Sequence, residues 1–178
     1  MISKKAKTAA FCGVCAALAL GLSYLETLLP ALPIPGMRLG LSNVVTIFLL
    51  YSVGAKYALA VSLVRVVLSA ALFGSFSSFL YSVAGAALSF VTMWLLLRLG
   101  RFSLTAVSTA GGMLHNVGQL AVASVLFGYP IIATAYLPAL LICGTLTGIA
   151  VGVTAALLCK HLPKRLMKDI SNQKNEDF

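Results

Sequence analysis

The chain has 178 residues, of which 60% are apolar and only 10% are charged, and its mean hydropathy is +1.01. A soluble domain has about half apolar and about a quarter charged residues, so this composition excludes an ordinary soluble fold and indicates an integral membrane protein. The formal net charge of +9 does not indicate nucleic-acid binding, because the basic residues flank apolar stretches, where they would contact anionic lipid.

The apolar stretches predict one all-α membrane domain over residues 8–159, between a basic N-terminus (1–7) and a basic, polar tail (160–178). Stretches of this length predict a bundle of six membrane-spanning helices. In chain order the predicted helices cover residues 8–29, 39–53, 57–73, 79–97, 104–127 and 131–159. The second is short, which predicts a tilt or a partly unwound start. The sixth is too long for one straight span, so we expect it to be tilted or broken by Pro138.

The distribution of basic residues predicts the orientation of the bundle. With six spans, every Lys and Arg except Arg38 and Arg65 falls on the side that holds both termini. The positive-inside rule makes that side cytoplasmic. The N-terminus, basic and then apolar, is also similar to a signal peptide. We predict that it is retained, because the rest of the chain is membranous and the orientation is consistent with this segment present.

A Pro-rich link over residues 30–36 follows the first predicted helix and cannot form a regular helix. Glu26, Arg38 and Asn43 surround this link in the outer half of the membrane. Glu26 and Arg38 could form a structural ion pair that closes the link, or they could contact a ligand. Both interpretations stay open from the sequence.

Arg65 lies near the middle of the third predicted helix. A charged side chain at this depth costs about 2.5–3.5 kcal/mol on insertion scales, so it normally faces the bundle interior and has a partner. The alternative is that Arg65 lies nearer the cytoplasm and extends its charge to the membrane surface. Lys56 already occupies that end, and nine residues place Arg65 about 13 Å deeper, which favours an interior position.

The fifth predicted helix contains a cluster of polar residues. His115 and Gln119 share one helix face above Gly111 and Gly112, and Asn116 is turned about a quarter circle away. The glycines permit close approach of a neighbouring helix or a ligand. These polar side chains could also form hydrogen bonds that join the helices, but three polar side chains within five residues favour a binding site.

Ser and Tyr residues in the predicted outer turns also suit a binding site, although Tyr is common at the membrane interface. We therefore predict an outward-facing pocket with Arg65 at its floor. Two arginines and one glutamate suggest an anionic or zwitterionic ligand. The candidate ligand-binding residues are Arg38, Asn43, Arg65, Tyr81, His115, Asn116 and Gln119.

The first predicted helix has small residues at every fourth position, Ala9, Gly13 and Ala17. Such a ridge lets another helix pack closely, which suggests a surface for docking a partner. The ridge could equally serve packing within the bundle, because Ala is common in membrane helices.

No pattern in the sequence indicates catalysis or a bound cofactor. There is no Asp before Asp169 and hence no Asp-rich diphosphate motif, and there is no phosphate-binding loop or cluster of metal ligands. Cys12 and Cys15 have the spacing of a redox or metal pair, but no second pair completes a site, so we interpret them as small apolar residues.

Several of these segments, in their order and spacing, resemble the Gx transporter family, which is often labelled heptaprenyl diphosphate synthase component I. The resemblance covers about residues 8–158. The segments are Pro33-Ile-Pro-Gly-Met-Arg-Leu-Gly-Leu-Ser-Asn43-Val-Val-Thr, Arg65, Leu72-Phe-Gly-Ser-Phe-Ser-Ser-Phe-Leu-Tyr81-Ser and His115-Asn-Val-Gly-Gln119.

That family is similar to the substrate-binding S components of energy-coupling factor transporters. The resemblance implies a six-helix protein of the bacterial cytoplasmic membrane that captures a micronutrient, with a flavin or a quinone precursor as a plausible ligand. It further implies a transmembrane T subunit and cytoplasmic ATPases as partners. The ridge of Ala9, Gly13 and Ala17 would dock the T subunit, and the link over residues 30–38 would cover the site. Gly13 departs from the expected Ala but keeps the surface small.

The family label implies a rival hypothesis. On this interpretation the chain is a non-catalytic membrane scaffold for heptaprenyl diphosphate synthesis or for flavin-based extracellular electron transfer, and its basic tail would recruit the enzyme. A channel or stand-alone transporter is a weaker third hypothesis, because the sequence shows no two-half repeat.

Overall fold

The computed structural model describes residues 4–29, 38–128 and 130–161, with the side chains of residues 4, 5 and 130–134 left out. The predicted all-α fold is confirmed for these residues, which form six helices. The helices are α1 (Lys4–Leu28), α2 (Asn43–Ser52), α3 (Ala55–Phe73), α4 (Phe76–Leu99), α5 (Leu104–Phe127) and α6 (Pro130–His161). Five of them, all except α2, are long and apolar enough to cross a membrane. The chain is therefore a multi-pass membrane protein.

The second predicted span, residues 39–53, is only partly helical. Gly40 has a φ of 83°, and the chain turns at residues 41 and 42 before α2 begins at Asn43. The ten residues of α2 rise about 15 Å, half of the roughly 30 Å hydrocarbon thickness. The unwound start expected for this segment is present, and α2 is too short to span a membrane alone.

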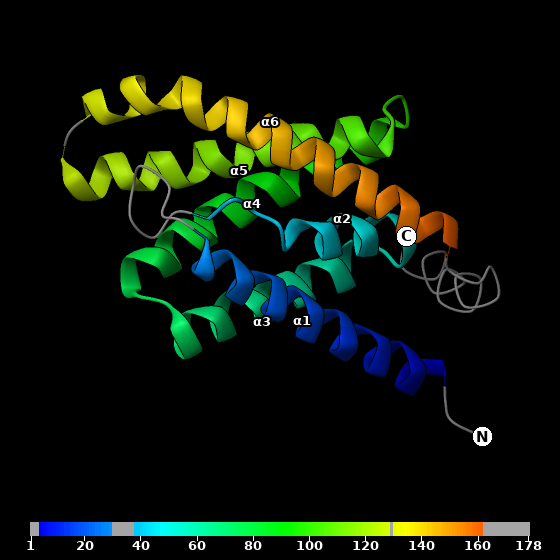
Figure 1. Ribbon diagram of the computed structural model, residues 1–178. Helices are drawn as coiled ribbons and strands as arrows, with labels where there is room; N and C mark the ends of the chain where they lie inside the picture. The colour runs from blue at the N-terminus through cyan, green and yellow to red at the C-terminus, as the bar shows by residue number, and fades with distance from the viewer. Residues whose placement is uncertain (1–3, 30–37, 129, 162–178) are drawn as a thin grey trace.

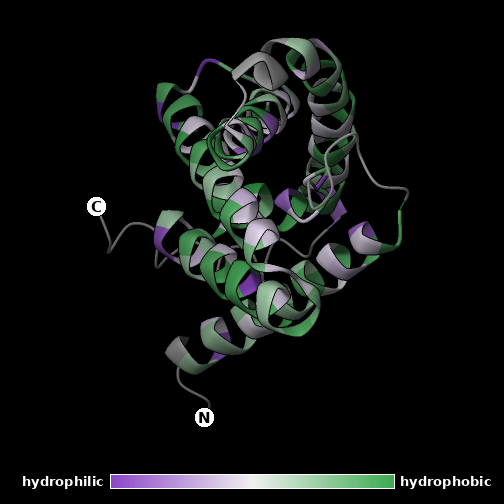
Figure 2. Ribbon diagram, turned by 90° about the vertical axis from the view of Figure 1, so that its left-hand side faces the viewer, coloured by the Kyte–Doolittle hydropathy of each residue, from purple (hydrophilic) through white to green (hydrophobic). Residues whose placement is uncertain are grey.

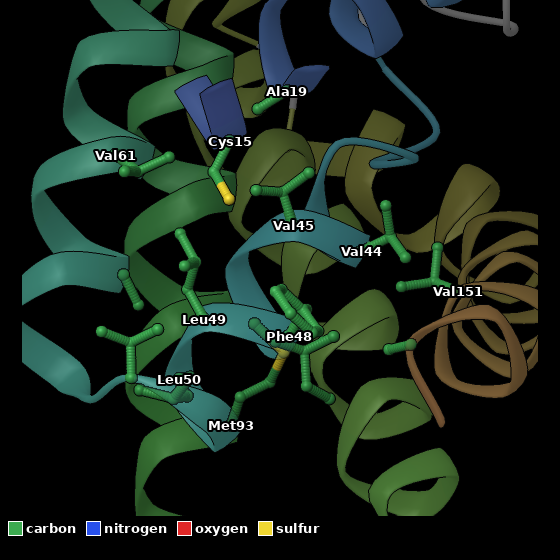
Figure 3. Close-up of a cluster of buried hydrophobic side chains, with 14 of the residues drawn as sticks. Cys15, Ala19, Val44, Val45, Phe48, Leu49, Leu50, Val61, Met93 and Val151 are labelled. Carbon is green, nitrogen blue, oxygen red and sulfur yellow. The ribbon is translucent and has the colours of Figure 1, made fainter. Parts of the chain in front are cut away.

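Helix α2 forms the centre of the bundle. It contacts α1, α3, α4 and α6, and nearly all of its residues are buried. A helix that is apolar on every side must be buried in this way. Figure 3 shows its side chains Val45, Phe48 and Leu49 among Cys15 of α1, Val61 of α3, Met93 of α4 and Val151 of α6.

Successive helices run in opposite directions, so that the connections between them lie alternately at the two ends of the bundle. The start of α1 and the end of α6 lie at the same end of the bundle as the α2–α3 and α4–α5 turns, to the right in Figure 1. The α3–α4 turn, the end of α5 and the start of α6 lie at the opposite end. Lys7, Lys56, Arg98, Arg101 and Lys160 therefore gather at one end, as the charge pattern predicts.

The start of α4 and the course of α6 can each be compared with the prediction. Helix α4 begins at Phe76, three residues before the predicted start, because the hydroxyl of Ser75 accepts the N–H of Ser78 at 3.2 Å and caps the helix. Helix α6 contains Pro138 within its length and is not broken there. Its 32 residues rise about 48 Å, so the expected overlength is confirmed.

Most residues along the helices are apolar (Figure 2), and many large apolar side chains are exposed. Large side chains such as Phe76 and Val125 are 77% and 81% exposed, respectively. A continuous apolar surface of this kind is unfavourable in water and suits contact with lipid tails.

Candidate ligand-binding site

Arg38 reaches from the segment before α2 to the last turns of α3 and the start of α4. Its Nη1 donates to the hydroxyl of Ser69 at 3.1 Å, and its Nη2 donates to that of Ser78 at 3.4 Å. Its guanidinium carbon lies 5.8 Å from the ring centre of Phe73. Arg38 therefore joins three segments of the fold through one side chain.

Gln119 holds the backbone of Arg38 against α5. The Arg38 N–H donates to Gln119 Oε1, and Gln119 Nε2 donates to the Arg38 carbonyl, both at 2.8 Å. The oxygen and the nitrogen of this buried side-chain amide thus both form hydrogen bonds with the main chain of Arg38, 81 residues away. Gln119 fixes the position of Arg38, and direct contact of Gln119 with a ligand stays a prediction.

His115 is wedged between the segment before α2 and helix α4. A Cβ on Gly40 would lie 3.1 Å from His115 Cδ2, and a Cβ on Gly85 would lie 2.8 Å from the imidazole. Asn43 is also next to Gly40, and its Nδ2 donates to Ser89 Oγ at 3.3 Å. The two glycines therefore make the space in which His115 approaches the start of α2.

Arg65 lies on the inward face of α3 and is 1% exposed, so its predicted interior position is confirmed. Glu26 of α1 is close enough to Arg65 and Arg38 to interact with both charges. Its Oε1 accepts the N–H of Leu41. Glu26 thus ties α1 to the segment before α2 through the main chain, and its contribution to the arginines is electrostatic.

Several buried polar atoms in this region have no partner in hydrogen-bonding geometry among the described residues. They include Glu26 Oε2, Arg65 Nε and Nη2, and His115 Nδ1 and Nε2. Buried polar groups in proteins are nearly always paired with protein or water. A group of unpaired ones around two arginines makes this region the candidate site, and binding of a ligand there stays a prediction.

Two predicted site residues have other surroundings. Tyr81 is buried in an apolar cluster with Leu120, Ala123 and Leu140. Asn116 donates through Nδ2 to the carbonyl of Leu140 at 2.7 Å and so links α5 to α6. Tyr81 and Asn116 therefore face the α6 side of the bundle.

The sequence interpretation missed the serines within the helices of this region and noted only those of the predicted outer turns, which include Ser78. Ser69 and Ser78 bind Arg38, and Ser89 binds Asn43. Ser62 and Ser69 share the buried face of α3 with Arg65, and Ser78, Ser82 and Ser89 share a face of α4 with Gly85. Their helical spacing was the available signal, since residues three, four and seven apart lie on one face. The predicted cover of the site is the link over residues 30–38, and all of it except Arg38 lies outside the described residues.

The ridge of Ala9, Gly13 and Ala17 faces away from the bundle. All three residues are exposed, and a Cβ on Gly13 would meet no atom within 4 Å. The opposite face of α1, which includes Cys15, Ala19 and Ser23, is buried. Packing within the bundle therefore does not use the ridge, and docking of a partner stays a prediction.

The chain matches the model of a known family. The sequence model of a family described as heptaprenyl diphosphate synthase component I matches residues 15–158. No curated protein and no solved structure matches the chain.

Proposed function

The chain belongs to the heptaprenyl diphosphate synthase component I family, and we propose that it is the substrate-binding membrane subunit of an energy-coupling factor type uptake transporter. In this proposal it lies in the bacterial cytoplasmic membrane with both termini inside, and its basic termini contact anionic lipid. It performs no catalysis itself.

The observation that carries the proposal is the buried polar cluster at the start of α2. A helix of half the membrane thickness begins inside the bundle and is preceded by non-helical backbone at residues 38–42. Such backbone is tolerated at membrane depth only where protein buries it or where it lines a cavity. Transporters place broken helices of this kind at their substrate sites, with the positive end of the helix dipole towards the substrate.

The charges of the cluster support a small anionic or aromatic ligand. Arg38 and Arg65 exceed the single carboxylate of Glu26, so the cluster has a surplus of positive charge. The unpaired Arg65 nitrogens and the imidazole of His115 can donate hydrogen bonds to a carboxylate or a carbonyl. A flavin or a quinone precursor offers such acceptors on an aromatic ring.

The exposed ridge supports a membrane partner. Ala9, Gly13 and Ala17 present a smooth strip to the lipid, and strips of small residues permit close packing of membrane helices. We propose that a transmembrane T subunit docks here and that cytoplasmic ATPases drive release of the ligand. The name component I likewise describes one part of a larger assembly.

The same name supports a second function, that of a scaffold for a prenyl-transfer enzyme. A scaffold would use exposed cytoplasmic residues and would have no need of a cluster of unpaired polar groups inside the bundle. The arrangement of Arg38, Arg65 and His115 therefore favours the transporter.

The test is to purify the tagged protein from its own host in mild detergent and to identify both the proteins and the small molecules that accompany it. We expect paired ATPases with a polytopic subunit, and a small anionic or aromatic compound released on denaturation. Arg65→Gln should lower the amount of that compound at least tenfold, because it removes a buried charge that is available to the ligand.

Gly13→Trp should leave the bound compound in place and remove the ATPases, because the large side chain would hold a partner helix away. Ala87→Trp is the matched control, since Ala87 is also a small exposed residue but lies on α4 and not on the ridge. Recovery of a soluble prenyl synthase without ATPases, by wild type and Arg65→Gln alike, would support the scaffold and refute the transporter.

A further inference from the structure

A groove lies at the opposite end of the bundle from Arg38. Arg38 contacts the last turns of α3 and the start of α4, whereas the groove lies between the α2–α3 turn and the last turns of α4. Its volume is about 380 Å³, within the range of about 300–1,000 Å³ typical of small-molecule pockets. No part of the proposed transport function uses it.

The groove is apolar along most of its length and has two basic side chains at one end. Leu59, Phe90 and Val91 line the apolar part, and Lys56 and Arg98 line the other end. Phe90 precedes Arg98 by eight residues of α4, so the apolar part extends about 12 Å towards the centre of the membrane. A groove with an apolar part and a basic end fits an amphiphile, whose hydrocarbon chain would lie in the apolar part and whose anionic head would lie at the basic end.

The charges at this end favour an anion. Glu26 is the only acidic residue in ranges 4–29, 38–128 and 130–161, and it lies in the cluster with Arg38. Lys56, Arg98 and Arg101 all lie at the groove end. The Arg98 guanidinium lies 4.4 Å from the ring centre of Trp94, which holds it over the groove wall.

We propose that this groove binds an anionic phospholipid, with the phosphate between Lys56 and Arg98 and one acyl chain along Leu59 and Val91. Basic pockets between membrane helices bind anionic head groups. Trp94 and Tyr57 on the groove lining are the residue types that proteins place at head-group level. Leu59 and Val91 are 43% and 48% exposed, so the acyl chain of the lipid can enter the groove directly from the surrounding membrane.

Trp94 makes a direct test possible because it is the single tryptophan of the chain. The full-length protein is reconstituted in phosphatidylcholine vesicles that contain a minor fraction of phosphatidylglycerol. Two samples are compared: in one the phosphatidylglycerol carries brominated acyl chains, and in the other an equal amount of phosphatidylcholine does. Brominated chains quench tryptophan fluorescence on contact. We expect stronger quenching by brominated phosphatidylglycerol.

Lys56→Gln should reduce the preference for phosphatidylglycerol about fivefold, the effect expected for loss of one cation near an anionic head group. Arg101→Gln is the matched control, because it removes one positive charge from the same end without lining the groove. Val91→Phe should reduce quenching by either lipid, because it fills the groove and keeps the charges. The ratio of the two quenching values within each variant cancels changes in tryptophan intensity.

Equal quenching by the two lipids in the wild type would overturn the proposal. If Lys56→Gln and Arg101→Gln lost the preference for phosphatidylglycerol to the same extent, the preference would come from the general surface charge. That result would also overturn the proposal. Removal of the preference by inorganic phosphate, or by an isoprenoid diphosphate at the concentration of the phosphatidylglycerol, would assign the groove to that compound instead.

Discussion

Buried polar side chains in this bundle fall into two groups that differ in what their hydrogen-bonding atoms contact. Gln119 and Arg38 bind to each other or to neighbouring serines and hold segments together. Arg65 and His115 have nitrogen atoms with no partner among the described residues. We infer that the first group fixes the site and that the second contacts the ligand.

This division predicts that Gln119→Leu destabilises the fold. Leu has a similar volume, but the buried N–H and carbonyl of Arg38 would lose their partners at a cost of about 1–3 kcal/mol. The thermal midpoint in detergent should fall and the Arg38 segment should become more sensitive to protease. Ser124→Ala on the same helix is the control, because its hydroxyl binds only the carbonyl of Leu120 one turn away. An unchanged midpoint for Gln119→Leu would contradict the holding role.

At the scale of the elements, the bundle combines a short central helix with very close contacts between α5 and α6. A Cβ on Gly112 would lie 2.5 Å from the carbonyl oxygen of Gly144. A Cβ on Gly148 would lie 2.7 Å from the Cα of Thr109. Backbones meet here without side chains between them, which is how small residues join membrane helices.

Gly144→Ala should therefore separate α5 from α6 and weaken the fold. The new methyl would lie 2.8 Å from the carbonyl oxygen of Gly112, a backbone atom that cannot rotate away. Forcing extra volume into a packed contact costs about 1–3 kcal/mol, visible as a lower thermal midpoint. Gly21→Ala is the control, since a Cβ there meets nothing within 4 Å. Alanine is also the better helix former, so a fall for Gly21→Ala equal to that for Gly144→Ala would refute the packing argument.

At the scale of the whole molecule, the charge pattern and the fold agree on which ends belong together. The basic residues of separate helices gather at the end that also holds the start of α1 and the end of α6 (Figure 1). The positive-inside rule predicts that this end is cytoplasmic.

Two phenylalanines test this orientation. Phe102 in the α4–α5 turn and Phe127 at the end of α5 are 49% and 48% exposed, respectively, at opposite ends of the bundle. In a variant whose native cysteines are replaced, Phe127→Cys should react with a membrane-impermeant maleimide on intact cells. Phe102→Cys should react only after permeabilisation. The reverse pattern would invert the predicted topology.

The sequence by itself determined the membrane class, the helical fold, the gathering of basic residues at one end and the inward position of Arg65. Each depends on local composition or on the cost of a charge in hydrocarbon, which acts on a residue whatever its neighbours are. The length of α2 was predicted less well, because a positive φ at Gly40 and burial by four helices decide where its helical turns begin.

Only the tertiary structure decided how the polar residues are paired. Gln119 binds Arg38 across 81 residues, Tyr81 faces the apolar cluster beside α6, and the Ala9–Ala17 ridge faces outward. The groove of Lys56 and Arg98 joins residues 42 positions apart. Helical spacing gives the face of a residue but not the neighbour that the face meets, because that depends on how the helices pack around α2.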